Sequence, residues 1–177
     1  TAIRLAEHKR RLELMSTRDG MTGVFNRRHW ETLLRNEFEA CRRSHRQATI
    51  LLIDIDHFKT INDTWGHDVG DEAIVAITRQ LQLTLRSGDY IGRFGGDEFA
   101  VIMSGTPADS AIAAMSRVHE RLVNMPLHGA PMARLCISVG VAPWGAQFTH
   151  YREWLKAADV ALYKAKNAGR GRTEVAA

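Results

Sequence analysis

The stretch RFGGDEF, Arg93 to Phe99, is the most informative part of this sequence. β-prone apolar runs flank it, YIGRF at 90–94 and FAVIM at 99–103. Two adjacent glycines between such runs predict a β-hairpin, because Gly-Gly reaches the positive φ angles that a tight primed turn needs. Two carboxylates, Asp97 and Glu98, follow the turn at once.

A second acidic cluster ends another apolar run. Residues 48–55 form a continuous β-branched and leucine-rich stretch, which is typical of a strand buried on both faces, and Asp54 and Asp56 lie at its end. If this strand neighbours the hairpin, Asp54 and Asp97 point into one cleft. Hard carboxylate oxygens without a His or Cys ligand set favour Mg²⁺ over zinc. Paired Mg²⁺ ions serve phosphoryl or nucleotidyl transfer. From these residues alone, solvated turn acids are the alternative.

Bulk composition indicates one soluble domain. The 177 residues are 45% hydrophobic and 25% charged, which suffices for a single core. A net charge of +4 is compatible with a phosphate ligand. The sequence has no Arg/Lys stripe interleaved with aromatic residues, so nucleic-acid binding is not expected. Cys41 and Cys136 offer no disulfide framework and no zinc spacing, as expected of a cytosolic protein. No apolar run approaches the ~18 residues of a membrane span.

Hydrophobic periodicity predicts a mixed α/β order rather than a regular doubly wound fold. Helices are expected at 1–17, 27–45, 57–63, 71–85, 107–124 and 151–166, and strands at 48–55, 90–94, 99–103 and 134–142, with loops at 18–26 and 66–70. The first helix is a charged linker or signalling helix, or the end of a dimerising helix from an upstream module. The chain is expected to be the C-terminal piece of a longer protein, with any membrane contact upstream.

Several motifs resemble one known family. GGDEF at 95–99 reproduces the signature of the GGDEF domain, the diguanylate cyclase family. DGMTGVFNRR at 19–28 is similar to the family's opening D-x-L-T-x-L-x-N-R-R, with Met21 and Val24 replacing the leucines. Further matches follow in order at 54–63, 66–71, 138–142 and 158–170. The narrower resemblance is to an enterobacterial, membrane-anchored cyclase that governs cellulose production.

The resemblance implies a fold and a reaction. The fold is α/β (α+β), a mixed, mainly antiparallel five-stranded sheet covered by helices, similar to nucleotide cyclases and polymerase palms. Residues 18–177 would be the catalytic domain, cytoplasmic and joined to an inner-membrane anchor. Two GTP would give cyclic di-GMP and two pyrophosphates across a homodimer. Two Mg²⁺ ions per site, or Mn²⁺ as an alternative, would be held by Asp54, the Ile55 carbonyl, Asp97 and Glu98. Asp97 would also accept the 3′-hydroxyl proton.

Other residues are assigned to the nucleotide through the same resemblance. Gly95 and Gly96 would let the backbone approach the α-phosphate and ribose. Catalytic Lys59, with Phe58 beside it, would neutralise the β- and γ-phosphates, and Lys166 and Arg170 would clamp the terminal phosphates. Each of these cations could instead be an ordinary solvated helix charge.

Guanine recognition is assigned to Asn62 and Asp71. Asp71 can accept from the ring N1–H and the exocyclic amine together, a donor pair that adenine lacks. The alternatives are a helix-end cap for Asn62 and a helix N-cap for Asp71. His67 belongs either near the ribose or merely in the turn.

An R-x-x-D pattern, Arg86 to Asp89, precedes the glycines at the spacing of the family's inhibitory product site. Arg117 would add a contact there. The alternative is that Arg86 ends a helix and Asp89 starts a turn.

A degenerate binding module that senses cyclic di-GMP or GTP without turnover is a competing hypothesis. Such modules typically lose the acids that this chain keeps. A one-substrate cyclase or a polymerase palm shares the two-metal chemistry but not the guanine-reading pair.

Overall fold

Strand β2 (Ala48–Ile55) is one of the two central strands of the sheet and is paired along both of its edges. The computed structural model describes residues 1–177, apart from the side chain of Leu14. β2 runs antiparallel to β4 (Glu98–Ser104) on one side and to β5 (Ile137–Pro143) on the other. β3 (Tyr90–Arg93) and β4 form the predicted antiparallel hairpin. The mixed, mainly antiparallel sheet that the sequence predicted is therefore confirmed.

Across the described chain the sheet has six strands in the order β1-β3-β4-β2-β5-β6, so the predicted count of five was wrong by one. The short edge strands β1 (Phe25–Asn26) and β6 (Thr173–Val175) pair in parallel with β3 and β5. β1 lies in the segment 18–26 that the sequence pattern assigned to a loop, and β6 lies after the last predicted helix, where no strand was expected. Strands of two or three residues are too short to carry an alternating pattern.

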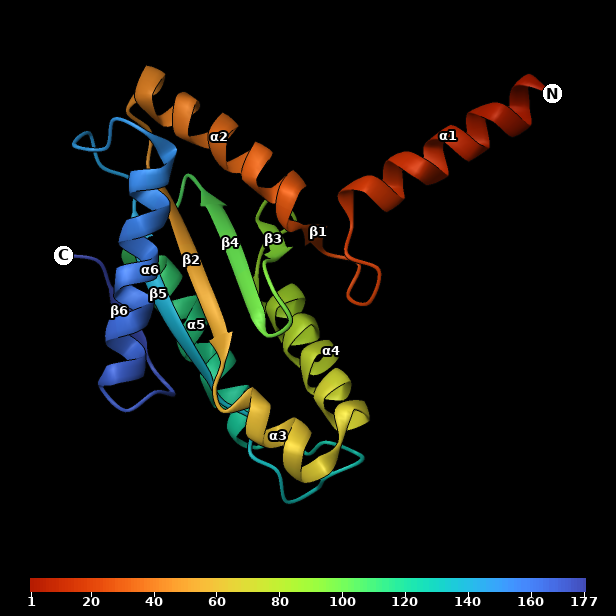
Figure 1. The fold of residues 1–177 in the computed structure, drawn as a ribbon. Coiled ribbons are helices and arrows are strands. Elements are labelled where there is room, and N and C mark those ends of the chain that lie inside the picture. The colour runs from red at the N-terminus through yellow and green to blue at the C-terminus, as the bar shows by residue number, and fades with distance from the viewer.

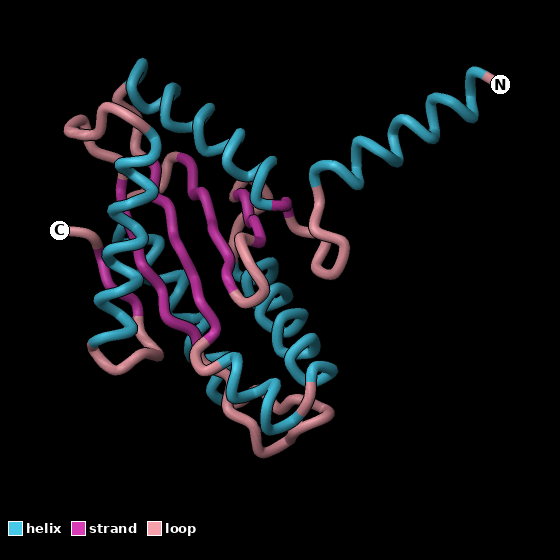
Figure 2. Tube along the Cα trace, in the orientation of Figure 1, coloured by secondary structure: helices cyan, strands magenta, loops and turns pink.

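Helices cover both faces of this sheet (Figure 1). α2 (Arg27–Ser44) and α6 (Tyr151–Asn167) lie on one face, and α4 (His67–Thr84) and α5 (Ala108–Val123) lie on the other. The short helix α3 (Phe58–Trp65) follows the end of β2. α1 (Ala2–Thr17) projects away from the rest of the chain, as the tube in Figure 2 shows. Its apolar side chains Ile3, Leu5 and Met15 are about 70% exposed.

Two hydrophobic clusters stabilise the sheet from its two sides. Leu51 and Ile53 of β2 pack into the cluster with α4 and α5, while Ile50 and Leu52 pack into the cluster with Trp30 of α2 and Trp154 of α6. Successive side chains of a strand point to opposite faces, so β2 is buried on both, as its sequence predicted. Among the described residues, no helix is long and apolar enough to cross a membrane.

The start of α4 differs from the prediction. The sequence indicated a loop at 66–70, but α4 already begins at His67. Gly66 alone breaks the chain, with a φ of 91°. Gly70 lies inside the helix because it packs closely on α3, where an added Cβ would come 1.8 Å from Oδ1 of Asn62. A glycine that permits close packing was thus misread as a loop residue.

Candidate active site

The ends of β2 and of the β3–β4 hairpin meet, as the sequence predicted. Asp54 lies opposite Glu98 in the β2–β4 register. The Ile55 N–H donates to the Asp97 carbonyl at 3.0 Å, which joins the hairpin loop to the end of β2. Two acidic segments far apart in the sequence are thereby brought to one edge of the sheet.

The hairpin loop is wider than the predicted primed turn. Four residues, Phe94 to Asp97, separate the strands, and the Phe94 N–H closes the loop on the Glu98 carbonyl at 2.8 Å. Neither Gly95 nor Gly96 has a φ in the left-handed region. The expectation that positive φ angles explain this glycine pair was therefore wrong. At Gly96 an added Cβ would meet no atom within 4 Å, so the backbone there is open.

Asp54 and Asp97 form an acidic pair that lacks a full complement of positive charge. Asp54 is 8% exposed, and its Oδ2 pairs with Nζ of Lys166. Its buried Oδ1 has no hydrogen-bond partner in the described part of the chain. The neighbouring Asp97 can supply one only when it is protonated, because an ionised carboxylate is only an acceptor. Burial first, and then the Asp54 charge, raises the pKa of Asp97 to about 6.

This arrangement fits a cation as its missing partner. A buried, unpartnered carboxylate oxygen beside a second carboxylate is stabilised by a proton or by a hard metal ion. Among the described residues, no group of three or more His, Cys, Asp or Glu side chains is gathered into a complete metal site. The two carboxylates are therefore only a partial ligand set, which further ligands would have to complete.

Glu98 is exposed at the start of β4. It lines a pocket of about 370 Å³ together with Asp159 and Lys166 of α6. The structure thus places Glu98 beside the same lysine that pairs with Asp54. It does not gather Glu98 into a closed cage with the other two acids.

Asp56 anchors the turn after α6. The buried carboxylate accepts from the Ser138 hydroxyl at 2.6 Å and from the Gly171 N–H at 2.8 Å. Nη1 of Arg170 lies 3.8 Å from its Oδ1. Arg170 itself has a positive φ of 64°. The two cations assigned to the terminal phosphates therefore each meet an acid at or just after the end of β2. Lys166 pairs with Asp54, and Arg170 lies beside Asp56.

The residues assigned to the base lie on α3 and α4. Oδ1 of Asn62 is buried without a hydrogen-bond partner within the described chain. Gly70, next to Asp71, packs directly on it. Asp71 is exposed inside α4, five positions after Gly66, so the N-cap alternative for Asp71 was wrong. An unpartnered amide oxygen on a helix pair is a strong candidate for a ligand contact.

The remaining predicted nucleotide residues lie around this helix pair. Phe58 is half-buried and Lys59 exposed in the first turn of α3, directly after the end of β2. His67 is exposed as the first residue of α4.

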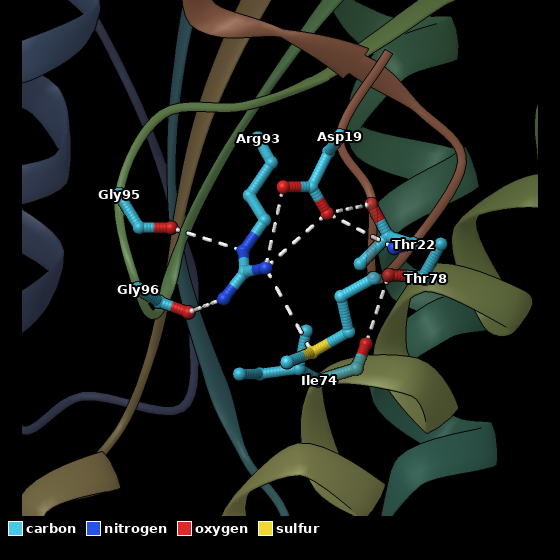
Figure 3. Close-up of polar contacts among 8 residues, drawn as sticks. Asp19, Thr22, Ile74, Thr78, Arg93, Gly95 and Gly96 are labelled. Atoms are coloured by element: carbon cyan, nitrogen blue, oxygen red, sulfur yellow. Dashed lines mark hydrogen bonds and ion pairs between the residues drawn. The ribbon is translucent and has the colours of Figure 1, made fainter. Parts of the chain in front are cut away.

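Arg93 forms the most connected polar cluster near the hairpin, and sequence reasoning missed it (Figure 3). Its Nε donates to the Gly95 carbonyl at 3.2 Å and its Nη2 to the Gly96 carbonyl at 2.9 Å. Its Nη1 pairs with Oδ2 of Asp19 at 3.2 Å. Thr22 donates to the same oxygen from its N–H at 2.9 Å and from its hydroxyl at 2.7 Å. One guanidinium thus connects the hairpin loop, Phe94 to Asp97, to the turn after α1.

The electrostatics of Asp19 follow from this cluster. Burial alone would raise the pKa of Asp19, but the hydrogen bonds from Thr22 and Arg93 outweigh it and lower the pKa. The sequence signal that could have pointed to this cluster is the opening motif at 19–28, because it contains both Asp19 and Thr22. The pairing with Arg93 spans 74 positions and requires the tertiary structure.

The R-x-x-D segment forms a closed turn after α4. The Arg86 N–H donates to Oδ2 of Asp89 at 2.9 Å, and burial raises the pKa of Asp89. Both residues line a pocket of about 490 Å³. Of the α5 arginines, Arg121 reaches the end of α4, where it donates to the Thr84 hydroxyl at 2.8 Å. Arg117 is exposed on α5 and is not one of the residues lining this pocket.

Comparison with known proteins agrees with this architecture. Residues 16–172 match the family described as diguanylate cyclase, GGDEF domain. The chain belongs to this family.

Among curated relatives, the chain is 76% identical over 177 residues to the probable diguanylate cyclase DgcC of Escherichia coli (strain K12), covering all of this chain and 48% of DgcC. It is 36% identical over 175 residues to the diguanylate cyclase DgcM of the same organism, covering 95% of this chain and 41% of DgcM. The chain therefore spans about half the length, or less, of these relatives.

Solved structures show the same fold. The coiled coil and GGDEF domain of DgcB from Caulobacter crescentus, in complex with c-di-GMP, superimposes with a TM-score of 0.94 at 26% identity, covering 99% of this chain and 93% of that one. The diguanylate cyclase SiaD from Pseudomonas aeruginosa, in complex with its activator SiaC, gives a TM-score of 0.85 at 33% identity, covering 99% of this chain and 68% of that one.

Proposed function

We propose that this chain is a catalytic domain that condenses two GTP molecules into cyclic di-GMP and two pyrophosphates. The 3′-hydroxyl oxygen of each GTP forms a bond to the α-phosphorus of the other, the bond to the pyrophosphate oxygen breaks, and each hydroxyl loses its proton. The observation that carries the proposal is the acidic pair, Asp54 with its unpartnered buried oxygen and Asp97 with its raised pKa. The family match supports the choice of reaction.

Asp54, Asp97 and the Ile55 carbonyl are the proposed ligands of Mg²⁺ or Mn²⁺, with Glu98 as a further acid. When bound, such an ion lowers the pKa of a hydroxyl and stabilises charge that develops on a phosphate. Asp97 is the proposed acceptor of the 3′-hydroxyl proton at its carboxylate. A pKa near 6 suits this role, because the group is mostly ionised at neutral pH yet still basic enough to take a proton.

Substrate binding is proposed to use both the cations and the helix pair. Lys59, in the first turn of α3, attracts the β- and γ-phosphates, helped by the N–H groups of that turn. Lys166, in the last turn of α6, and Arg170, in the turn after it, would exchange their carboxylate partners for terminal phosphates. The unpartnered Oδ1 of Asn62 accepts from the guanine edge, and Asp71 accepts from the N1–H and the exocyclic amine.

The reaction needs two domains face to face, because each domain holds one GTP. We therefore propose a homodimer as the active species, with α1 as the linker helix that brings two catalytic domains together. The exposed apolar side chains of α1 support this role. We also propose that the domain acts in the cytoplasm, where GTP is available. In this account, any membrane anchor belongs to another part of a longer protein.

Product inhibition is the proposed role of the Arg86–Asp89 pocket. Its cation, its acid and its volume of about 490 Å³ suit a ligand that carries both phosphate and guanine groups.

A forced dimer tests the proposal. The chain is fused after a leucine zipper, incubated with GTP and Mg²⁺, and pyrophosphate release is measured. We expect turnover by the fusion, a large loss for Asp97→Asn, and activity retained in Asp109→Asn, a matched acid at the start of α5 away from the site. Turnover by Asp97→Asn at the unmodified rate would contradict the assignment. GTP binding without turnover by the fusion would favour the binding-module hypothesis.

A further inference from the structure

Two consecutive residues after α1 contact two different sites. Asp19 binds Arg93, which in turn holds the Gly95 and Gly96 carbonyls of the catalytic loop (Figure 3). Arg18, the residue before it, lines the pocket that contains Arg86 and Asp89. The product pocket and the catalytic loop therefore meet the same short piece of chain.

Arg18 is held in a defined position by three contacts. Its backbone forms an isolated antiparallel bridge with Phe25, and its guanidinium carbon lies 4.0 Å above the centre of the Phe25 ring. Its Nη1 donates to the Gly23 carbonyl at 3.3 Å. A guanidinium has five N–H donors, so it can hold this carbonyl and an anionic ligand at the same time.

The pocket has the chemistry for a guanine nucleotide with two phosphates. Arg18 and Arg86 supply positive charge, and Asp89 supplies an acceptor for a base edge. Leu85, Tyr90 and Ile91 provide apolar surface against which a base can lie. Its volume of about 490 Å³ is within the range of small-molecule sites.

The turn between the two sites is held by several hydrogen bonds. The Asp19 N–H donates to the Val24 carbonyl at 2.7 Å, and the Gly23 N–H donates to the Asp19 carbonyl at 2.9 Å. The two hydrogen bonds from Thr22 fix the Asp19 carboxylate on the same turn. A displacement or stiffening of Arg18 is therefore passed to Asp19 rather than absorbed by a flexible loop.

We propose that Arg18 is a ligand-binding residue of the product pocket, and that product bound there restrains the catalytic loop through Asp19 and Arg93. The inference rests on the proposed function, since it specifies how cyclic di-GMP at the Arg86–Asp89 pocket acts on catalysis. It adds a residue to the pocket and a physical route from the pocket to the Gly95–Gly96 carbonyls.

Calorimetric titration with cyclic di-GMP tests whether Arg18 binds the product. The 177-residue chain is compared with Arg18→Ala, Arg86→Ala and Arg79→Ala, the last being an exposed arginine of α4 outside the pocket. We expect Arg18→Ala to raise the Kd roughly tenfold, since one charge-assisted hydrogen bond is lost, and Arg79→Ala to change it less than about twofold.

The possible results are distinguishable. If the unmodified chain and Arg18→Ala bind equally well while Arg86→Ala is weakened, the product pocket stands and the role of Arg18 is overturned. If the unmodified chain does not bind cyclic di-GMP, both the proposed inhibitory site and the proposed role of Arg18 are overturned. Equal weakening by Arg18→Ala and Arg79→Ala would show a general charge effect and would also overturn the contact.

Hydrogen exchange tests whether bound product restrains the loop at Gly95 and Gly96. At saturating cyclic di-GMP, we expect slower exchange of the Gly95 and Gly96 amides in the unmodified chain. In Arg18→Ala, at a ligand concentration raised to restore saturation, this slowing should be lost although the pocket is full. Unchanged exchange of these amides on binding, or equal slowing in both proteins, would overturn the proposed route.

Discussion

Lys166 forms an ion pair with the buried carboxylate of Asp54 across 112 positions of sequence. The lysine supplies part of the positive charge that the acidic pair requires. It would therefore compete with a divalent cation for Asp54, unless a phosphate draws it away.

Replacing Lys166 tests this competition. We expect Lys166→Met to bind Mn²⁺ several-fold more tightly than the unmodified chain in the absence of nucleotide, because the acid pair loses its internal cation. Binding of a non-hydrolysable GTP analogue should weaken in the same variant. Both affinities can be measured by calorimetry, with Lys164→Met, an exposed lysine of the same helix, as the control. Weaker Mn²⁺ binding by Lys166→Met would contradict the competition.

The raised pKa of Asp97 predicts a pH dependence of stability without metal. An acid whose folded pKa is about 6 resists ionisation in the folded state, so its penalty is absent below about pH 4 and grows as pH rises through 6. Because the Asp97 side chain is partly exposed to solvent, we expect an effect of roughly 1 kcal/mol rather than the full shift. Thermal unfolding in EDTA should show Asp97→Asn gaining more stability over the unmodified chain at pH 7.5 than at pH 4.5. An equal stability gain of Asp97→Asn at both pH values would show that the gain does not come from ionisation of Asp97.

Gly70 allows α4 to pack on α3. An added Cβ would lie 1.8 Å from Oδ1 of Asn62, so we expect Gly70→Ala to lose roughly 1–3 kcal/mol of stability and to weaken guanine nucleotide binding. Urea unfolding and nucleotide titration measure the two effects. Gly88→Ala is the matched control, because its Cβ would meet no atom within 4 Å. Similar stability of the two variants would show that the helices adjust without cost.

Arg93 holds two loop carbonyls and Asp19 with one planar group. Lysine keeps the charge but lacks the planar fork, so Arg93→Lys should leave the catalytic loop poorly positioned. In the zipper fusion we expect kcat to fall roughly tenfold with a smaller change in KM for GTP. Steady-state kinetics and a parallel unfolding curve separate positioning from stability. An unchanged kcat would show that the cluster does not position the loop.

Inhibition by product depends on Arg86 in this account. The half-inhibitory concentration of cyclic di-GMP is measured for each enzyme relative to its own uninhibited initial rate. We expect this concentration to be roughly tenfold higher, or more, for Arg86→Ala than for the unmodified chain. The same experiment with Arg117→Ala asks whether the α5 arginine outside the observed pocket contributes. An unchanged inhibition constant for Arg86→Ala would remove the regulatory site.

Sequence patterns were sufficient for the elements that carry a long periodic signal. The run at 48–55 predicted a doubly buried strand, and the glycine pair predicted a hairpin. That the two are neighbours, and so bring Asp54 and Asp97 together, was only a condition until the sheet order was known. The two-residue strand β1 and the three-residue strand β6 were missed, because their formation depends on neighbours already in place. Gly70 was misread because close packing and chain breaking both select glycine.

The polar contacts of the site were the least predictable part. Lys166, Arg170 and Arg93 each carry a charge that local sequence could assign to solvent or to a ligand. Their carboxylate partners Asp54, Asp56 and Asp19 lie many positions away. Only the folded sheet brings these pairs together, so their identity is a property of the tertiary structure.

The acidic pair Asp54 and Asp97 is assigned to the metal-dependent condensation of GTP, and identification of the product tests that chemistry. The zipper-fused chain is incubated with GTP and Mg²⁺, and the nucleotides are separated by chromatography and identified by mass. We predict a cyclic di-GMP peak that grows with two pyrophosphates released per molecule and that is absent without the metal. A fusion that is folded, dimeric and bound to GTP but yields no cyclic di-GMP would contradict the account.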